Sequence, residues 1–137
     1  MKKFISSKFR IKSNDILFEG GNRLQKKKKK IIKGFPVITI ITVVKNNEKY
    51  LEETIKSVLN QKYKNLEYII IDGASEDGSI NIIKKYIKKI DYAISQKDKN
   101  LWDAINKGLS LSTGDLIGIV NSDDILTPSA LKLLNKY

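Results

Sequence analysis

The chain contains no cysteine and no histidine among its 137 residues. The missing cysteines exclude disulfide bonds, zinc–thiolate sites and a cysteine nucleophile. The missing histidines exclude a Ser-His-Asp triad, imidazole metal ligands and the most common general base. Any catalysis by this chain must therefore rely on carboxylates, lysines, hydroxyl groups or a bound metal ion.

Long apolar stretches are also missing. The longest strongly apolar run, Val37 to Val44, is far shorter than the roughly 18 residues that a membrane-spanning helix needs. The N-terminal residues lack the apolar core of a secretory signal peptide. With 41% apolar and 30% charged residues, the composition is typical of a globular domain with a genuine core. We expect a cytoplasmic location.

The net charge of +11 is concentrated near the N-terminus. Residues 1–35 hold 12 Lys/Arg and 2 Asp/Glu, a balance of +10, whereas residues 36–137 hold 14 and 13, a balance of +1. We therefore predict a basic, partly disordered arm over residues 1–35 and a globular domain over residues 36–137. The lysine run 26–30 favours a solvated leader. Two alternatives stay open: contact with anionic lipids at the inner face of the membrane, and contact with a nucleic-acid backbone, which rests on this run alone.

Predicted strands and helices alternate from residue 36 onward. The strands are expected at residues 37–44, 66–71, 92–95 and 116–120, and the helices at about 48–59, 80–90, 102–110 and 129–137. The apolar, β-branched runs are typical of strands buried on both faces of a parallel sheet. The third helix is expected to bury Trp102, Ile105 and Leu109. The order predicts an α/β fold, a doubly wound, mostly parallel sheet with helices on both faces.

Polar side chains lie at the ends of three of the predicted strands. They are Thr42 with Asn46, Asp72 with Ser75, and Asp123 with Asp124. The carboxyl ends of parallel strands share one edge of the sheet, where open α/β sheets bind their ligands. We therefore expect these side chains to converge on one ligand, and their chemistry fits a nucleoside diphosphate. A carboxylate such as Asp72 can accept a hydrogen bond from a base or a ribose hydroxyl.

The adjacent carboxylates of Asp123 and Asp124 repel each other at the end of an apolar strand. A divalent cation would relieve this repulsion, because hard carboxylate oxygens suit magnesium, calcium or manganese. The alternative is a solvated Asp-Asp turn. Neither a P-loop motif nor a G-x-G-x-x-G motif follows a strand, which argues against the two commonest nucleotide-binding folds.

A series of motifs extends the pattern through the whole domain. The motifs occupy residues 36–46, 50–55, 57–61, 71–79, 103–108, 113–115 and 121–124. Together they resemble family 2 glycosyltransferases of the GT-A fold, over the nucleotide-sugar-binding half. The resemblance implies inverting transfer of a sugar from a nucleotide-diphosphate donor, often a UDP-sugar, to a saccharide or lipid-linked acceptor. It also implies a divalent metal cofactor, Mn or Mg.

The resemblance assigns roles to single positions. Nucleotide-sugar binding falls on Thr42, Asn46, Asp72, Ser75, Asn106 and Asp124, and metal binding falls on Asp123 and Asp124. Thr42 and Asn46 would line the base pocket. Asp72 would hold the base or ribose, with Ser75 beside it. Asn106 would support the donor site from the helix before the fourth strand.

Three positions depart from the family pattern, and the general base has no candidate. Lys45 stands where tyrosine is common, Asn121 where the first aspartate of the metal motif is common, and Ile105 where many members have arginine. Asp98 and Asp103 could approach the site, but no spacing makes either one the base. The sequence has no Asp, Glu or His after Asp124. We therefore expect donor binding with little or no transfer by this chain alone, as a fragment without the acceptor half.

Overall fold

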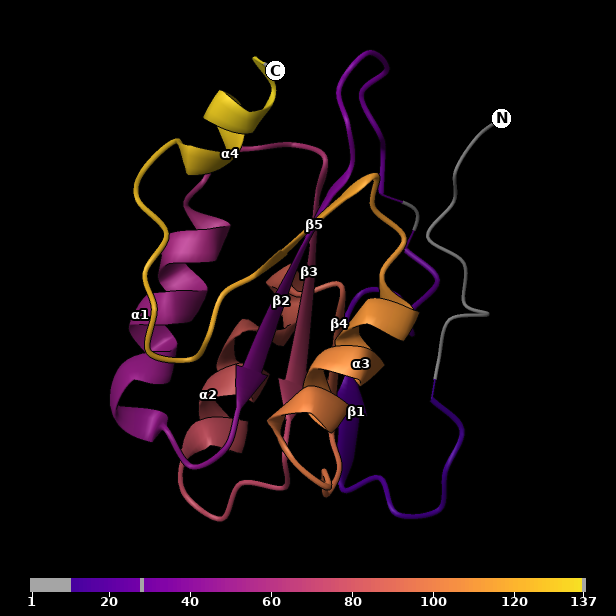
Figure 1. Cartoon of the computed structure of the whole chain (residues 1–137). Coiled ribbons are helices and arrows are strands. Elements are labelled where there is room, and N and C mark those ends of the chain that lie inside the picture. Colours follow the sequence, from indigo (N-terminus) through magenta and orange to yellow (C-terminus); the bar gives the residue numbers. More distant parts are fainter. Residues whose placement is uncertain (1–10, 28, 137) are drawn as a thin grey trace.

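The computed structural model describes residues 11–27 and 29–136. Its five strands are β1 (Phe18–Gly20), β2 (Ile38–Val44), β3 (Leu66–Asp72), β4 (Tyr92–Ser95) and β5 (Leu116–Ile119). They form one sheet in the order β1-β4-β3-β2-β5 (Figure 1). β2 is parallel to both β3 and β5, β3 is parallel to β4, and only β1 is antiparallel to its neighbour. The mostly parallel sheet is confirmed.

Helices cover both faces of the sheet, as expected for a doubly wound fold (Figure 1). They are α1 (Glu48–Leu59), α2 (Ser79–Tyr86), α3 (Leu101–Leu111) and α4 (Ala130–Leu134), with a short 3-10 helix η1 (Ile87–Lys89) after α2. The second predicted helix is thus divided into two pieces, and the last helix is shorter than its predicted span. No helix among the described residues is long and apolar enough to cross a membrane.

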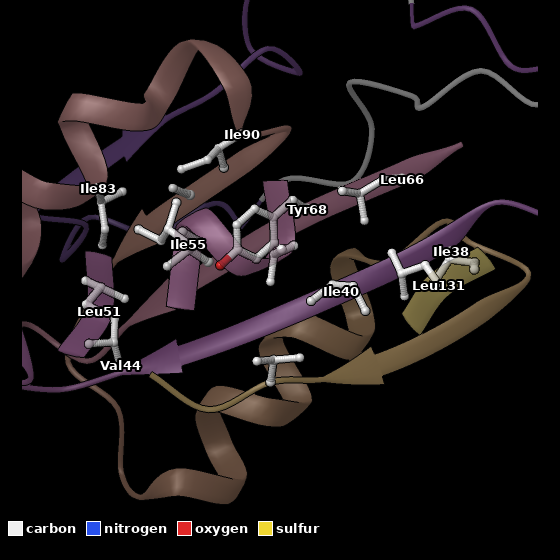
Figure 2. Packing of buried hydrophobic residues seen from close by; sticks show 14 residues of the cluster. Ile38, Ile40, Val44, Leu51, Ile55, Leu66, Tyr68, Ile83, Ile90 and Leu131 are labelled. Atoms are coloured by element: carbon white, nitrogen blue, oxygen red, sulfur yellow. The ribbon is translucent and has the colours of Figure 1, made fainter. Parts of the chain in front are cut away.

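The core consists of two clusters separated by the sheet. Leu51, Ile55 and Ile83 of α1 and α2 pack around the fully buried ring of Tyr68 on one face (Figure 2). Ala104 and Leu111 of α3 close the second cluster on the other face. Because alternate side chains of a strand point to opposite faces, each central strand contributes to both clusters.

Two predictions about burial are wrong. The strand before the acidic pair was expected in the interior, but β5 is an edge strand whose Ile117 is 45% exposed. The third helix was expected to bury Trp102 and Leu109, which are 70% and 42% exposed. α3 instead turns its small residues toward the sheet: a Cβ at Gly108 would lie 2.5 Å from Cγ2 of Ile41. Such close approach is what a glycine permits.

The predicted boundary at residue 35 does not separate an arm from a domain. β1 pairs with β4, and Arg23 is 4% exposed against the sheet. The guanidinium of Arg23 donates to Glu67 over 3.1 Å and lies 5.3 Å from the ring centroid of Tyr92. Residues 16–24 are therefore part of the domain, whereas the part of the predicted arm before residue 11 lies outside the described residues.

Candidate functional site

A pocket of about 370 Å³ lies at the carboxyl edge of the sheet. Its lining residues are Val43, Val44, Lys45, Gly73, Asp98, Lys99, Asn100, Leu101, Ala104, Asn121, Ser122 and Asp123. They come from the ends of β2, β3 and β5, from the loop after β4 and from the first turn of α3. The parallel register produces this convergence, because Val44 pairs with Asp72 and the amide of Gly73 donates to the carbonyl of Val44 over 2.8 Å.

Asp72 directly precedes the pocket residue Gly73, and its carboxylate already accepts hydrogen bonds within the protein. The side chain is fully buried. It accepts hydrogen bonds from the Ser75 amide (3.0 Å), the Ser75 hydroxyl (2.5 Å) and the Ser95 hydroxyl (2.6 Å). Three donors hold the carboxylate as a structural acceptor that fixes the loop after β3. Gly73, and not Asp72, is the residue of this strand end that faces the pocket.

Asn46 and Ser75 brace this loop against the end of β2. The amide of Asn46 donates to the hydroxyl of Ser75 over 2.8 Å, and the side-chain oxygen of Asn46 accepts from the amide of Glu76 over 2.7 Å. Asn46 has a φ of 49°, a left-handed conformation that asparagine tolerates well. Direct hydrogen bonds therefore join the ends of β2 and β3, although neither the Asn46 nor the Ser75 side chain lines the pocket.

Thr42, which the family resemblance assigns to the base pocket, is not among the residues that line this pocket. Thr42 is fully buried, and its hydroxyl shares a hydrogen bond of 2.9 Å with the hydroxyl of Tyr68. It points to the face of α1 and α2, whereas its neighbour Val43 belongs to the cluster under α3, where the pocket opens. Asn106 of α3 is exposed and also lies outside the pocket lining.

The two aspartates after β5 have different surroundings. Asp123 is exposed and lines the pocket, whereas Asp124 is exposed outside the lining. The backbone of Asp124 is fixed, since its carbonyl accepts from the hydroxyl of Thr54 over 2.7 Å. Ser122 is held by the side-chain amide of Asn47 over 2.9 Å. The turn therefore presents Asp123 to the pocket from a fixed backbone.

The donor atoms at this turn suit a divalent cation that is shared with a ligand. The described residues contain no group of three or more acidic residues that could enclose a metal ion. Asp123 and Asn121 do place hard oxygen donors on the pocket wall. Magnesium is commonly held by one or two carboxylates together with substrate phosphates, so Asp123 and Asn121 would supply only part of the ligand set of such an ion.

Asp98 is a pocket residue that the strand-end argument missed. Its side chain is 9% exposed, lines the pocket and forms an ion pair with Lys107 of α3. Burial raises the pKa of Asp98, and the Lys107 charge opposes this effect. Lys107 also lies 3.7 Å from Asp103. The signal was available in the sequence, because Asp98 follows the end of the third predicted strand, the one strand end for which no polar group was assigned.

Comparison with known proteins decides the family. The sequence model described as Glycosyl transferase family 2 matches residues 39–137. The chain belongs to glycosyl transferase family 2. EpsE of Bacillus subtilis strain 168, which carries a provisional glycosyltransferase name, is 37% identical over 101 residues. The match covers 71% of this chain and 36% of EpsE, so the chain spans about a third of that relative.

Solved structures agree on the fold. A mannosyltransferase from Pyrobaculum calidifontis in complex with GDP-Man and Mn²⁺ superposes with a TM-score of 0.67 at 22% identity, over 75% of this chain and 32% of the mannosyltransferase. TarS residues 1–349 from S. aureus, in complex with UDP-GlcNAc, gives 0.64 at 24% identity, over 71% and 29%. These likenesses establish the GT-A fold of this family 2 chain.

Proposed function

We propose that the pocket binds a nucleoside-diphosphate sugar, with a UDP-sugar as the first candidate. The observation that carries the proposal is the pocket itself, which places Asp123 and Asp98 around one cavity at the carboxyl edge of a family 2 sheet. Ligands of open α/β sheets bind at this edge. Two structural neighbours were solved with GDP-Man and with UDP-GlcNAc, which supports a donor of this chemical class.

The two ends of the pocket suit the two ends of such a donor. The nucleoside would lie against Gly73 and Asp98, where a carboxylate can accept from a base N–H or a ribose hydroxyl. The diphosphate would lie at Asn121 and Asp123 together with a divalent cation, manganese or magnesium. When bound, this cation would neutralise the negative charge of the diphosphate. Asp124 would contact the sugar or the cation from outside the present lining.

The roles of the remaining positions become supporting ones. Asp72 with Ser75, and Asn46 with the following loop, would hold the floor and wall against which the nucleoside lies. Lys45 lines the pocket beside Gly73 and would add a positive charge near the donor. Asn106 of α3 lies outside the pocket lining and would support the donor site indirectly, through the helix.

We further propose that the complete reaction is inverting transfer to a saccharide or lipid-linked acceptor. Inversion requires a carboxylate to take the proton of the acceptor hydroxyl as the bond to the nucleoside diphosphate breaks. Among the described residues, the carboxylates that line the pocket are Asp98 and Asp123. Asp98 is already paired with Lys107 and Asp123 is placed for the cation, so the pocket supports donor binding more directly than proton removal. Donor binding without transfer is therefore the second candidate function.

Calorimetric titration of the chain with UDP, with and without MnCl₂, tests the proposal. We expect manganese to strengthen UDP binding, and Asp123→Asn to weaken it by about tenfold or more, since a charge-assisted contact contributes about 1.5–3 kcal/mol. Glu53→Gln removes an exposed carboxylate of α1 and is the matched control. The absence of manganese-dependent UDP binding would contradict both candidate functions.

A transfer and donor-hydrolysis assay with UDP-sugars then separates the two candidates. Release of UDP above the uncatalysed rate supports the enzyme. Binding without release supports the donor-binding function.

A further inference from the structure

A strongly charged surface lies at the edge of the sheet opposite the pocket. The pocket is at the carboxyl ends of β2, β3 and β5, whereas the segment of residues 29–36 projects beyond their amino ends, at the top of Figure 1. The side chain of Asn65, just before β3, fixes this segment. Its amide donates to the carbonyls of Ile32 and Phe35, each over 2.8 Å, and its oxygen accepts from the amide of Ile32 over 2.8 Å.

Three segments distant in the sequence bring lysines to this edge. The side chain of Asn22 donates to the carbonyl of Lys88 over 3.0 Å, which joins the segment after β1 to η1. Further along the same segment, the carbonyl of Ile32 accepts from the side chain of Asn65, which joins it to the loop before β3. The exposed lysines at this edge are Lys26, Lys27, Lys29, Lys30, Lys33, Lys62, Lys64, Lys88 and Lys89, here called the basic surface.

Among the residues that the structure describes, few carboxylates offset the basic surface. Asp91 is buried and binds one member, Lys29, over 3.1 Å. Glu67 is buried and binds Arg23. Asp115 is exposed, and its carboxylate accepts from the amide of Val37 over 2.9 Å. The lysines outnumber these carboxylates by a wide margin, so this edge presents a strong positive field.

The chemistry of the surface fits lipid head groups better than nucleic acid. Its cations are all lysines, and the one arginine in the described ranges, Arg23, is 4% exposed. Lysine is a point charge suited to a diffuse anionic surface, whereas arginine is preferred for paired contacts to phosphates and bases. Phe35 is 49% exposed in the projecting segment. An apolar side chain among lysines is typical of surfaces that lie on a membrane interface.

We propose that the basic surface docks this chain on an anionic lipid bilayer, with the lysines against the head groups and Phe35 in the interfacial layer. Attraction of juxtamembrane lysines to anionic leaflets is additive and weakens with salt. The docked orientation leaves the pocket at the far end of the sheet, open to a donor from solution. This proposal does not depend on the identity of the pocket ligand.

Sedimentation of the whole chain with vesicles tests the proposal. We expect binding to vesicles of phosphatidylcholine with phosphatidylserine, none to phosphatidylcholine alone, and a steep fall of affinity with added NaCl. Replacement of Lys62, Lys64, Lys88 and Lys89 by serine should weaken binding by at least about tenfold. The control replaces Lys12, Lys49, Lys84 and Lys97 by serine, because it removes the same charge from exposed positions elsewhere and should retain most of the binding. Phe35→Ser should weaken binding without any change of charge.

Three results would overturn the proposal. They are the absence of binding to anionic vesicles, an equal loss in the two quadruple variants, and tighter binding to a single-stranded RNA oligomer than to the vesicles at the same salt concentration. The last result would identify a nucleic-acid surface. Titration of the same variants with UDP is expected to give unchanged affinity, so failure of lipid docking remains distinguishable from failure of donor binding.

Discussion

Arg23 and Glu67 form a buried ion pair of 3.1 Å, which joins the segment after β1 to the central strand β3. Glu67 also accepts from the hydroxyl of Thr39 over 2.7 Å and from the amide of Thr113 over 2.8 Å. Arg23 donates in addition to the carbonyl of Leu111 over 3.0 Å. The Glu67 carboxylate of β3 is therefore bound to the segment after β1, to β2 and to the segment between α3 and β5.

We expect Arg23→Met to destabilise the chain strongly. The substitution leaves the Glu67 carboxylate buried without its cation, and loss of one member of a buried pair typically costs about 3–5 kcal/mol. Urea unfolding followed by circular dichroism measures the change. Lys85→Met is the control, since Lys85 and Glu52 form an ion pair with side chains 63% and 32% exposed, and we expect a much smaller change there. Equal losses in the two variants would contradict the structural role of Arg23.

Asp98→Asn should weaken nucleotide binding through the nucleoside. One carboxylate oxygen of Asp98 is bound to Lys107, and the other lies 3.1 Å from the position that a Cβ of Gly73 would occupy, at the pocket wall. We expect about tenfold weaker UDP binding, the effect of losing a contact of about 1.4 kcal/mol, with manganese-dependent pyrophosphate binding retained. Glu76→Gln, an exposed carboxylate of the loop after β3, is the control. Equal weakening for UDP and pyrophosphate would place Asp98 at the diphosphate instead.

Gly108→Ala should loosen the contact between α3 and the sheet. The added methyl group would lie 2.5 Å from Cγ2 and 3.1 Å from Cδ1 of Ile41, a fully buried side chain. Overpacking of this kind costs about 1–3 kcal/mol. A lower urea midpoint would show it, whereas Ser110→Ala on the exposed face of the same helix should leave the midpoint nearly unchanged. A more stable Gly108→Ala would mean that α3 moves freely on the sheet.

Glu52 should titrate far below the usual range. Hydrogen bonds from Lys85 and Tyr86 lower the pKa of Glu52 from 4.5 to about 2. A carboxyl group with a lowered folded-state pKa stabilises the fold above its unfolded-state pKa, and this contribution is lost as the pH falls from about 4.5 to about 2. Carboxyl ¹³C NMR titration measures the value directly, and Lys85→Met should raise it. A Glu52 pKa near 4.5 in the unmodified chain would rule out these hydrogen bonds in solution.

The main strands and their common edge could be predicted from the sequence, because long β-branched runs separated by amphipathic stretches permit few topologies. β1 could not be predicted. It has three residues and pairs antiparallel with β4, so its position depends on contacts between distant segments. The burial of Arg23 escaped prediction for the same reason, since its partner Glu67 is 44 residues away.

Side-chain direction was harder to predict than strand position. The large residues Trp102 and Leu109 were expected on the buried face of α3. Close packing of this helix on the sheet instead favours small residues there, such as Ala104 and Gly108. In the site, the strand ends were located correctly, whereas Thr42 points to the opposite face of β2. A sequence pattern also does not show whether a carboxylate already accepts hydrogen bonds within the protein. The carboxylate of Asp72 does so, for example from the hydroxyl of Ser75.

β5 pairs with β2, and within the described residues its other side has no neighbouring strand. Peptide groups along that side keep their hydrogen-bonding capacity, and Leu116, Ile117 and Ile119 remain half exposed beside them. An edge of this kind is a template for any extended polypeptide that reaches it. At high concentration the chain should therefore self-associate through this strand, and a charged substitution such as Ile117→Lys should keep it monomeric.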